Sequence, residues 1–462
     1  MERNDTQIVT AKLTFASVGL VWYAFLWSIG LIGCLAARKR YRLRPRSPLA
    51  SASASSVPGV SILRPLKGLD VNLYENLEST FQQEYSNYEI FLCVADESDQ
   101  ALPIVRDLIA KYPAVNAHVI IGEEVVGINP KVNNLIRAYR QASHDILWVI
   151  DSNISVDHGT LARSVDALDP PPRAAPSGRK RIALVHHVPY AFVTEPTLGA
   201  RIEEAFLNTN HAKMYLAINT AAIDSCVVGK SNLYRKSDLE RVDGTLKHST
   251  SAGSDGREKG LAAFGRFLAE DNMIAGALWH ELDLRHELSC DVARNAIGNM
   301  SLADYIWRRV RWIRVRKHMV LTATLVEPLT ESVLLGVLTS IALKYLIAFP
   351  PWMFLLLHFT GWLLIDLDVH TSLAGQPLPS GSAFRDFIVA WSLRELLALP
   401  IWCVAIWGSK VTWRGKDYFV MRNGELSRRG SGLEGWLPWN WLKGVNVHHK
   451  YEPLPVEETN TR

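Results

Sequence analysis

Three aspartates stand at the ends of apolar segments, where their carboxylates could do chemistry. Asp96 ends "FLCVAD", Asp151 ends "ILWVID", and Asp271 lies in "FLAEDNMIA". Any one of them could be an ordinary loop acid or a helix N-cap. Two acids that directly follow apolar strands are more informative, because ligands of a parallel α/β sheet bind at the carboxyl ends of its strands.

Carboxylates in this arrangement suit group transfer from a phosphorylated donor. Moving a sugar from a nucleotide diphosphate requires positive charge on the leaving diphosphate, and Mg²⁺ or Mn²⁺ prefers carboxylate oxygen. A second carboxylate must then take the proton of the incoming hydroxyl. We therefore predict that Asp151 holds a divalent metal and that Asp271 is the general base.

A further pair of candidates lies at the start of a predicted helix, in "NPKVNN". Lys131 and Asn133 stand where a cation and backbone N–H groups can meet phosphate. The alternative is a capped helix with a solvated lysine. We predict a donor-binding role for both residues.

The sequence lacks the motifs of several other enzyme classes. The motifs G-x-x-x-x-G-K-[ST], G-x-S-x-G and H-E-x-x-H are absent from the sequence, which removes P-loop hydrolases, common serine hydrolases and zinc proteases. The pair His186 and His187 lacks zinc spacing, and we predict a packing role for it. The five cysteines form no C-x-x-C pair, as in a reduced compartment.

The elements that must position these residues follow a regular alternation. Apolar runs at 59–66, 88–96, 117–122 and 145–151 predict strands, and the amphipathic stretches 72–83, 101–113 and 131–143 predict helices. Such alternation favours an α/β fold with a mainly parallel sheet that is covered on both faces.

Long apolar segments flank this region. Residues 13–37 contain 25 residues without a charge, enough to cross a bilayer, and are too long for an ordinary signal peptide. The basic run 38–46 that follows places the next domain in the cytosol. Its cations are expected to meet lipid headgroups and give no sign of nucleic-acid binding.

The chain is therefore expected to divide into six parts. Further membrane segments are predicted at 332–349, 351–367 and 387–407, and surface loops at 169–181 and 246–260. The parts are an N-terminal tail (1–12), a transmembrane anchor (13–37), a linker (38–57), an α/β domain (58–318), a C-terminal membrane region (319–409) and a polar tail (410–462).

An ordered set of motifs resembles the ceramide glucosyltransferases, the inverting membrane enzymes of glycosyltransferase family 21. The set comprises "LRPLKGLD", "CVADESD", "VGINPKVNNL", "DSNI", "AEDNMIA" and "RRVRW", followed by "WSLREL" and "TWRGKDY". The resemblance runs from about residue 58 to about residue 420. It implies a GT-A fold with transmembrane helices, related to family 2.

The resemblance also implies roles for three aspartates. Asp96 is similar to the aspartate that contacts the uridine of the donor. Asp151 resembles the aspartate that holds Mn²⁺ or Mg²⁺ on the diphosphate, although the triplet here is Asp-Ser-Asn and lacks a second acid. Asp271 resembles the base that deprotonates the primary hydroxyl of ceramide.

The same resemblance assigns residues to the donor phosphates and the acceptor. Arg308, Arg311 and Trp312 match the last motif of the family, which closes over both substrates. His211, in "NTNHAKMY", matches a histidine on the acceptor side. The remaining cations of this segment, Arg314, Arg316 and Lys317, are expected to face headgroups.

The function that follows is transfer of glucose from UDP-glucose to ceramide at the cytosolic face of a Golgi membrane. The substrates are UDP-glucose and ceramide, and the bilayer is a further partner. Rival interpretations are another family 2-like enzyme, such as a polysaccharide synthase, or a membrane scaffold or transporter without activity.

The last apolar segment leaves the topology open. Arg394 and Glu395 lie near its centre, as a structural ion pair or as a polar point near the lipid acceptor. The basic residues after Lys410 favour a cytosolic C-terminus, which three full C-terminal crossings would forbid. The segment could instead be re-entrant or interfacial.

Overall fold

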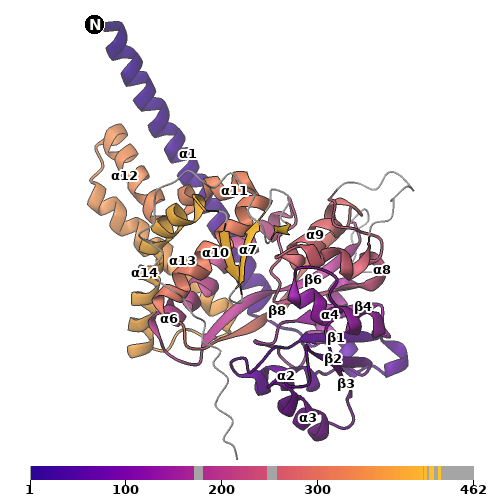
Figure 1. The fold of residues 1–462 in the computed structure, drawn as a ribbon. Coiled ribbons are helices and arrows are strands. Elements are labelled where there is room, and N and C mark those ends of the chain that lie inside the picture. Colours follow the sequence, from indigo (N-terminus) through magenta and orange to yellow (C-terminus); the bar gives the residue numbers. More distant parts are fainter. Residues whose placement is uncertain are drawn as a thin grey trace, which may run out of the picture.

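The computed structural model describes residues 2–170, 180–246, 258–408, 410–413, 416–420 and 425–427. A central sheet domain, from β1 to α10, lies beside a group of long helices from both ends of the chain (Figure 1). Most of the two predicted surface loops, 171–179 and 247–257, falls outside the described residues.

Eight strands form the sheet. In spatial order they are β3 (Asn116–Ile121), β2 (Tyr88–Val94), β1 (Val60–Pro65), β4 (Ile146–Ile150), β7 (Ser231–Arg235), β6 (Ile182–Val193), β8 (Arg285–Ile297) and β5 (Ile154–Ser155). Strands β1 to β4 are parallel, β7 is antiparallel to β4 and β6, β6 and β8 are parallel, and β5 is antiparallel to β8. The predicted α/β class is confirmed, with a sheet that is mixed.

Helices cover both faces of the sheet, as the buried strands require. Successive residues of β1 show this: Ile62 packs with α2, α3 and α5, whereas Leu63 packs with α4 and α9. The bounds are α2 (Leu73–Phe81), α3 (Leu102–Lys111), α4 (Pro130–Gln141), α5 (Thr160–Leu168), α6 (Leu198–Phe206), α7 (Ala212–Ala221), α8 (Lys236–Leu239), α9 (Glu270–His280) and α10 (Leu302–Met319).

The predicted packing role of the histidine pair agrees with its surroundings. His186 and His187 are fully buried in β6. The ring of His187 forms hydrogen bonds with the hydroxyls of Ser164 (3.0 Å) and Ser231 (2.9 Å). Burial lowers the pKa of both rings, so they are neutral.

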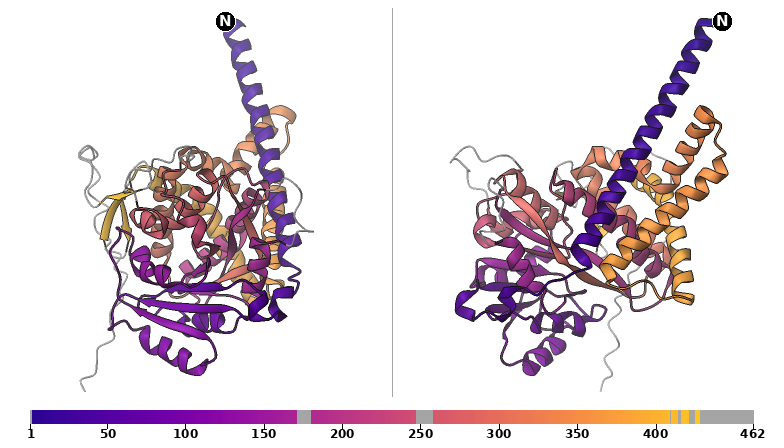
Figure 2. Two further views of the ribbon diagram at one scale, coloured as in Figure 1. Left: turned by 90° about the vertical axis from the view of Figure 1, so that its right-hand side faces the viewer. Right: turned by 180° about the vertical axis from the view of Figure 1, so that it is seen from behind.

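The first helix, α1 (Glu2–Tyr41), is longer than the predicted anchor. It includes most of the predicted tail and the first basic residues of the predicted linker, and it projects far beyond the sheet domain (Figures 1 and 2). Its lower part packs closely on α7, because a Cβ on Gly33 would lie 2.1 Å from the carbonyl oxygen of Lys213. The Lys213 ammonium in turn forms a fully buried ion pair with Asp366 (2.7 Å).

Four arginines of the basic run after the anchor bind protein carboxylates, whereas the contact of this run with headgroups stays a prediction. Arg38 and Arg42 both pair with Asp368 at 2.7 Å. Arg40 pairs with Glu287 at 2.8 Å, and Arg44 pairs with Asp157 at 2.6 Å. The sequence could not show these partners because they come from distant elements. The run therefore joins α1 to α13 and to the sheet domain.

Within the described residues, three helices are long and apolar enough to cross a membrane, or four if a bent pair counts as one span. Two of the three are α1 and α13 (Pro351–Ala374). The third is α14 (Ser382–Ile406), and the pair consists of α11 (Leu321–Val326) and α12 (Ser332–Ile347), bent by 63°. Pro350 precedes α13 and Pro351 begins it, so the break after α12 falls between the predicted segments 332–349 and 351–367.

The ionisable pair in α14 is a structural ion pair. The buried Arg394 guanidinium contacts Glu395 (2.6 Å) and Glu331 (2.8 Å). The Ser332 hydroxyl donates a hydrogen bond to Glu395. Buried charges persist in an apolar bundle when they are paired in this way.

Beyond α14, part of the predicted polar tail forms a small antiparallel sheet. Its strands are β9 (Lys410–Trp413), β10 (Lys416–Val420) and β11 (Leu426–Ser427). Buried Val411 and Tyr418 pack with Val315 of α10. The rest of the predicted tail, 428–462, lies outside the described residues.

Candidate active site

The ends of three parallel strands bring two of the predicted aspartates to one edge of the sheet. In the register, Pro65 of β1 lies opposite Cys93 of β2, and Leu63 lies opposite Val149 of β4. Asp96 and Asp151 therefore follow strands that end at the same level on either side of β1. This edge is where ligands of such sheets bind.

Asp96 lies exposed at this edge. Its Oδ1 accepts hydrogen bonds from the backbone N–H (2.9 Å) and the hydroxyl (2.5 Å) of Ser98. These bonds lower the pKa of Asp96. The carboxylate is thus ionised and fixed in direction, which suits recognition of a polar ligand group.

Asp151 lies between two ammonium groups. Lys131 contacts its Oδ1 at 2.8 Å, and Lys230 contacts its Oδ2 at 3.1 Å. Burial opposes ionisation of Asp151, but the two lysines outweigh it and lower its pKa. Sequence reasoning missed Lys230, which reaches Asp151 because β7 runs antiparallel to β4 and pairs Ser231 with Ile150.

Lys131 connects Asp151 to a second carboxylate. Asn129 caps α4 by accepting a hydrogen bond from the Lys131 backbone N–H at 2.8 Å, and the Lys131 ammonium reaches Glu270 at 3.0 Å. Burial alone would lower the pKa of Lys131, but Asp151 and Glu270 raise it well above its ordinary value. The lysine is therefore a fixed cation, as its predicted role in donor binding requires.

Asp271 lies in the first turn of α9, next to Glu270. The loop before β7 approaches it so closely that a Cβ on Gly229 would lie 2.6 Å from the Asp271 carboxylate. Burial, followed by the negative charges of Glu270 and Asp151, raises the pKa of Asp271 to about 7, although Lys131 opposes this. A carboxylate with a pKa near neutrality is well matched to proton abstraction.

The carboxylates offer limited ligation for a metal ion. Among the described residues, no group of three or more His, Cys, Asp and Glu side chains could hold one. Asp151 has hard oxygen atoms that suit Mn²⁺ or Mg²⁺, yet both already contact ammonium groups. A metal at Asp151 would have to displace a lysine and take its other ligands from the donor.

A third cation, Arg64 of β1, lies fully buried near Asp151 and was also missed. One guanidinium N–H group donates to the carbonyl of Ile154 (3.1 Å), while Nε and Nη1 have no hydrogen-bond partner among the described residues. Burial lowers its pKa to about 9, and the nearby charges of Asp151 and Asp70 oppose this. The sequence signal that could have identified Arg64 was its position within the motif "LRPLKGLD".

Asn133 is engaged with its own loop. Its Oδ1 accepts hydrogen bonds from the N–H groups of Val126 (3.0 Å) and Gly127 (3.1 Å), and its amide donates to the Gly127 carbonyl (3.0 Å). These bonds shape the loop that leads into α4. The donor contact of Asn133 stays a prediction.

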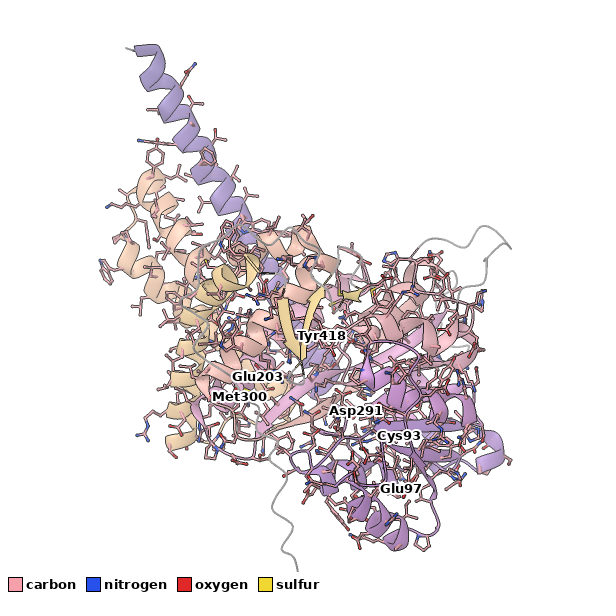
Figure 3. All side chains as sticks on the ribbon, in the orientation of Figure 1. Cys93, Glu97, Glu203, Asp291, Met300 and Tyr418 are labelled. Carbon is pink, nitrogen blue, oxygen red and sulfur yellow. The ribbon has the colours of Figure 1, made fainter. Side chains whose placement is uncertain are left out.

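The last predicted motif lies on α10, which begins with a capping box formed by Ser301 and Asp304. Arg308 pairs with the buried Glu203 of α6 at 2.9 Å, and Figure 3 shows Glu203 on the side of the sheet domain nearer the long helices. Arg311 has no hydrogen bond or ion pair within the described part of the chain, and burial lowers its pKa to about 10. Trp312 is 39% exposed.

The other cations of α10 bind protein groups, and their contact with headgroups stays a prediction. Arg314 donates to the Lys410 carbonyl (2.6 Å), and Arg316 pairs with Glu327. Lys317 donates to the carbonyls of Ile406 (3.1 Å) and Gly408 (2.7 Å), at the C-terminus of α14. Free carbonyls at a helix end attract such a cation.

His211 ends a π-helical turn, η3 (Leu207–His211), between α6 and α7. Its ring stacks on Tyr215 at 5.8 Å, and its Nδ1 is buried without a partner among the described residues. Burial, followed by the charge of Arg309, lowers its pKa to about 3. The Tyr215 hydroxyl accepts a hydrogen bond from Val228 N–H (3.2 Å), next to the loop that contacts Asp271.

The site thus gathers two ionised carboxylates, a carboxyl of raised pKa and several fixed cations. A carboxylate whose pKa is near neutrality can accept a proton while the adjacent cations hold an anion. Asp151, Lys131 and Asp271 come together as predicted. Arg311 and Trp312 lie on α10, which contacts α14, and His211 lies on η3, which contacts α13.

Known proteins resemble the chain over most of its length. Residues 25–426 match the family model "Glycosyl transferase family 21". The chain is similar to a ceramide glucosyltransferase of Komagataella phaffii (36% identity, 88% of this chain and 90% of the relative) and to one of Candida albicans (31% identity, 89% and 97%).

One of the solved structures that match the chain has low sequence identity to it. It is the mannosyltransferase PcManGT from Pyrobaculum calidifontis in complex with GDP-Man and Mn²⁺, at 16% identity and a TM-score of 0.42 over 83% of this chain and 99% of that chain. The α/β sheet with long helices on both sides in sequence agrees with the GT-A class that the motifs implied. On the family match and the identity to curated relatives, the chain belongs to glycosyl transferase family 21.

Proposed function

We propose that this family 21 enzyme transfers glucose from UDP-glucose to the primary hydroxyl of ceramide, with inversion at the sugar. The observation that carries the proposal is the raised pKa of Asp271, about 7, beside the cations that contact Asp151. A base and an anion site are thus adjacent. The names of the curated relatives support the choice of acceptor and sugar.

The reaction is an in-line displacement at the anomeric carbon. Asp271 takes the proton of the hydroxyl as its oxygen bonds to C1, and the electron pair of the breaking C1–O bond leaves with the diphosphate. Asp96 contacts the uridine, while Lys131 and Arg311 hold the phosphates. Mn²⁺ or Mg²⁺ at Asp151 would supply further positive charge to the leaving diphosphate.

The acceptor binds on the side of the site that faces the long helices. His211 is neutral and has an unpartnered Nδ1, so it can hydrogen bond to a lipid hydroxyl or amide. Trp312 offers an exposed apolar surface at the same helix as Arg311. Asn133 and Arg308 act by holding the loop before α4 and by fixing α10 on Glu203.

The test is product formation by the purified chain in detergent micelles. We expect a hexosylceramide from UDP-glucose and ceramide, identified by mass spectrometry, with a β-anomeric proton by NMR. UDP-galactose and diacylglycerol serve as alternative donor and acceptor. An α-linked product, or equal turnover with diacylglycerol, would contradict the proposal.

The membrane arrangement belongs to the same proposal, with the sheet domain in the cytosol of a Golgi membrane. The end of α13 returns to the sheet domain, because its Val369 and Leu373 pack with Val188 of β6. Both ends of α14 also contact that domain: Asp386 pairs with Arg201 of α6 (3.2 Å), and the Ile406 carbonyl binds Lys317. Three crossings, α1, the bent α11–α12 pair and α13, therefore suffice, and α14 stays on the cytosolic side.

Epitope tags measure this arrangement. We expect a tag after Arg462 to be reached by antibody when only the plasma membrane is permeabilised, because α14 does not cross. Tags before Met1 and between Ala348 and Pro350 should require full permeabilisation and should coincide with a Golgi marker. A protected C-terminal tag would show instead that α14 spans the bilayer.

A further inference from the structure

The carboxylate expected to hold a metal is saturated by ammonium groups. Its two oxygens contact Lys131 (2.8 Å) and Lys230 (3.1 Å), and both lysine side chains are only 18% exposed. Lys131 also contacts Glu270, so two carboxylates and two ammonium groups form one cluster of zero net charge. Partly buried ion pairs of this kind are screened little by salt and hold their geometry.

Lys230 is placed by backbone pairing and by a side chain of the metal-motif triplet. The Asp151 N–H donates to the Lys230 carbonyl (3.1 Å) where β4 meets β7. The Lys230 ammonium also contacts the Asn153 side-chain oxygen at 3.2 Å, and the Asn153 amide donates to Asn295 (2.9 Å). The third position of Asp-Ser-Asn thus binds a lysine.

We infer that Lys230, together with Lys131, supplies positive charge to the leaving diphosphate and competes with a divalent metal for Asp151. The inference rests on the proposed function. As the C1–O bond breaks and the diphosphate oxygen takes the electron pair, the ammonium groups held beside Asp151 stabilise the new negative charge. Charged donors fixed in a partly buried site stabilise such charge without reorganisation of water.

Removal of Lys230 is expected to change the affinity for a metal and the affinity for the nucleotide in opposite directions. A cation that enters at Asp151 must displace an ammonium group from one oxygen, and the cluster then carries excess positive charge. Removing Lys230 frees Oδ2 for a metal but removes a phosphate contact. A purely structural lysine would weaken both kinds of binding when it is lost.

The first experiment uses the wild-type full-length chain in micelles and isothermal titration calorimetry with UDP. We expect UDP to bind in EDTA within about tenfold of its affinity in Mn²⁺, or about 1.4 kcal/mol. Binding in Mn²⁺ alone overturns the inference and leaves the proposed function intact. No binding under either condition would count against both.

The second experiment compares Lys230→Gln with Lys230→Arg and with Lys180→Gln, which removes an exposed lysine paired with Asp283. Lys230→Gln should lower the UDP affinity in EDTA at least about tenfold. The same variant should raise the Mn²⁺ affinity without UDP about tenfold, measured by the EPR signal of free Mn²⁺. Lys230→Arg should keep UDP binding, and Lys180→Gln should change neither affinity.

A lower Mn²⁺ affinity in Lys230→Gln, or an unchanged UDP affinity in EDTA, overturns the inference. If Lys230→Gln does not fold, the wild-type titration in EDTA still decides the question.

Discussion

Replacement of Asp271 by asparagine is expected to lower kcat by about 10²- to 10⁴-fold, the usual contribution of a general base. Asparagine keeps the size of the side chain beside Gly229 but cannot take a proton. The affinity for UDP-glucose should change little, because the side chain at position 271 acts on the hydroxyl of the acceptor and not on the donor. Steady-state kinetics on the purified variant measure both quantities. Asp224→Asn, at an exposed ion pair with His280, serves as the control.

The pH dependence of the wild type gives an independent check on Asp271. Because the base must be ionised and its pKa is about 7, kcat should fall about tenfold per pH unit below 7. The raised pKa also affects stability. The folded state binds more protons than the unfolded state between about pH 4 and 7, so this residue lowers the free energy of unfolding as pH rises through that window.

Asp271→Asn should remove that penalty and raise the melting temperature at pH 8 relative to the wild type. Full activity of Asp271→Asn, or a wild-type rate that is independent of pH from 5 to 7, would show that another group is the base.

Replacement of Arg311 by alanine is expected to lower kcat/KM by about 10²- to 10³-fold, the loss typical of one charged transition-state contact. Arg311 is largely buried and has no hydrogen bond or ion pair among the described residues, which leaves its charge available to donor phosphates. An unpaired buried cation is costly to the fold. The melting temperature should therefore stay constant or rise while turnover is lost.

The matched control for Arg311 lies on the same helix. Arg316 pairs with Glu327, so Arg316→Ala removes a partly exposed ion pair and should cost no more than about 1 kcal/mol of stability. Its turnover should remain far above that of Arg311→Ala, and both variants should remain in the membrane fraction. Equal losses of turnover in the two variants would argue against a donor contact of Arg311.

The sequence predicted those parts of the site that depend on local pattern. Strands β1, β2 and β4 are short apolar runs before turns, so their parallel pairing and the positions of Asp96 and Asp151 followed. The cap at Asn129 placed Lys131 at the start of α4 for the same reason. Asp271 could be named from its motif, but its raised pKa needs the neighbours Glu270 and Gly229 in space.

The parts that the sequence could not predict depend on contacts between distant segments. Lys230 reaches Asp151 only because β7 enters the sheet antiparallel between β4 and β6. A hydropathy pattern indicates the length of α14 but not which parts of the protein its two ends contact. The ion pair of Asp386 and the hydrogen bond from Lys317 hold these ends on the sheet domain. Likewise, a run of arginines looks the same whether its partners are phospholipids or the carboxylates of Asp368, Glu287 and Asp157.

The close packing of α1 on α7 bears on how far the chain can be shortened at its N-terminus. Gly33 touches the Lys213 backbone, and Ala37 and Tyr41 are buried against the sheet domain and α13. Cutting the chain before β1 would strip these side chains from the surface they cover and open an apolar face to water. A shortened enzyme should therefore be cut within the exposed first turns of α1, before Ala16, and should keep the rest of the helix, which packs on α7, α12 and α13.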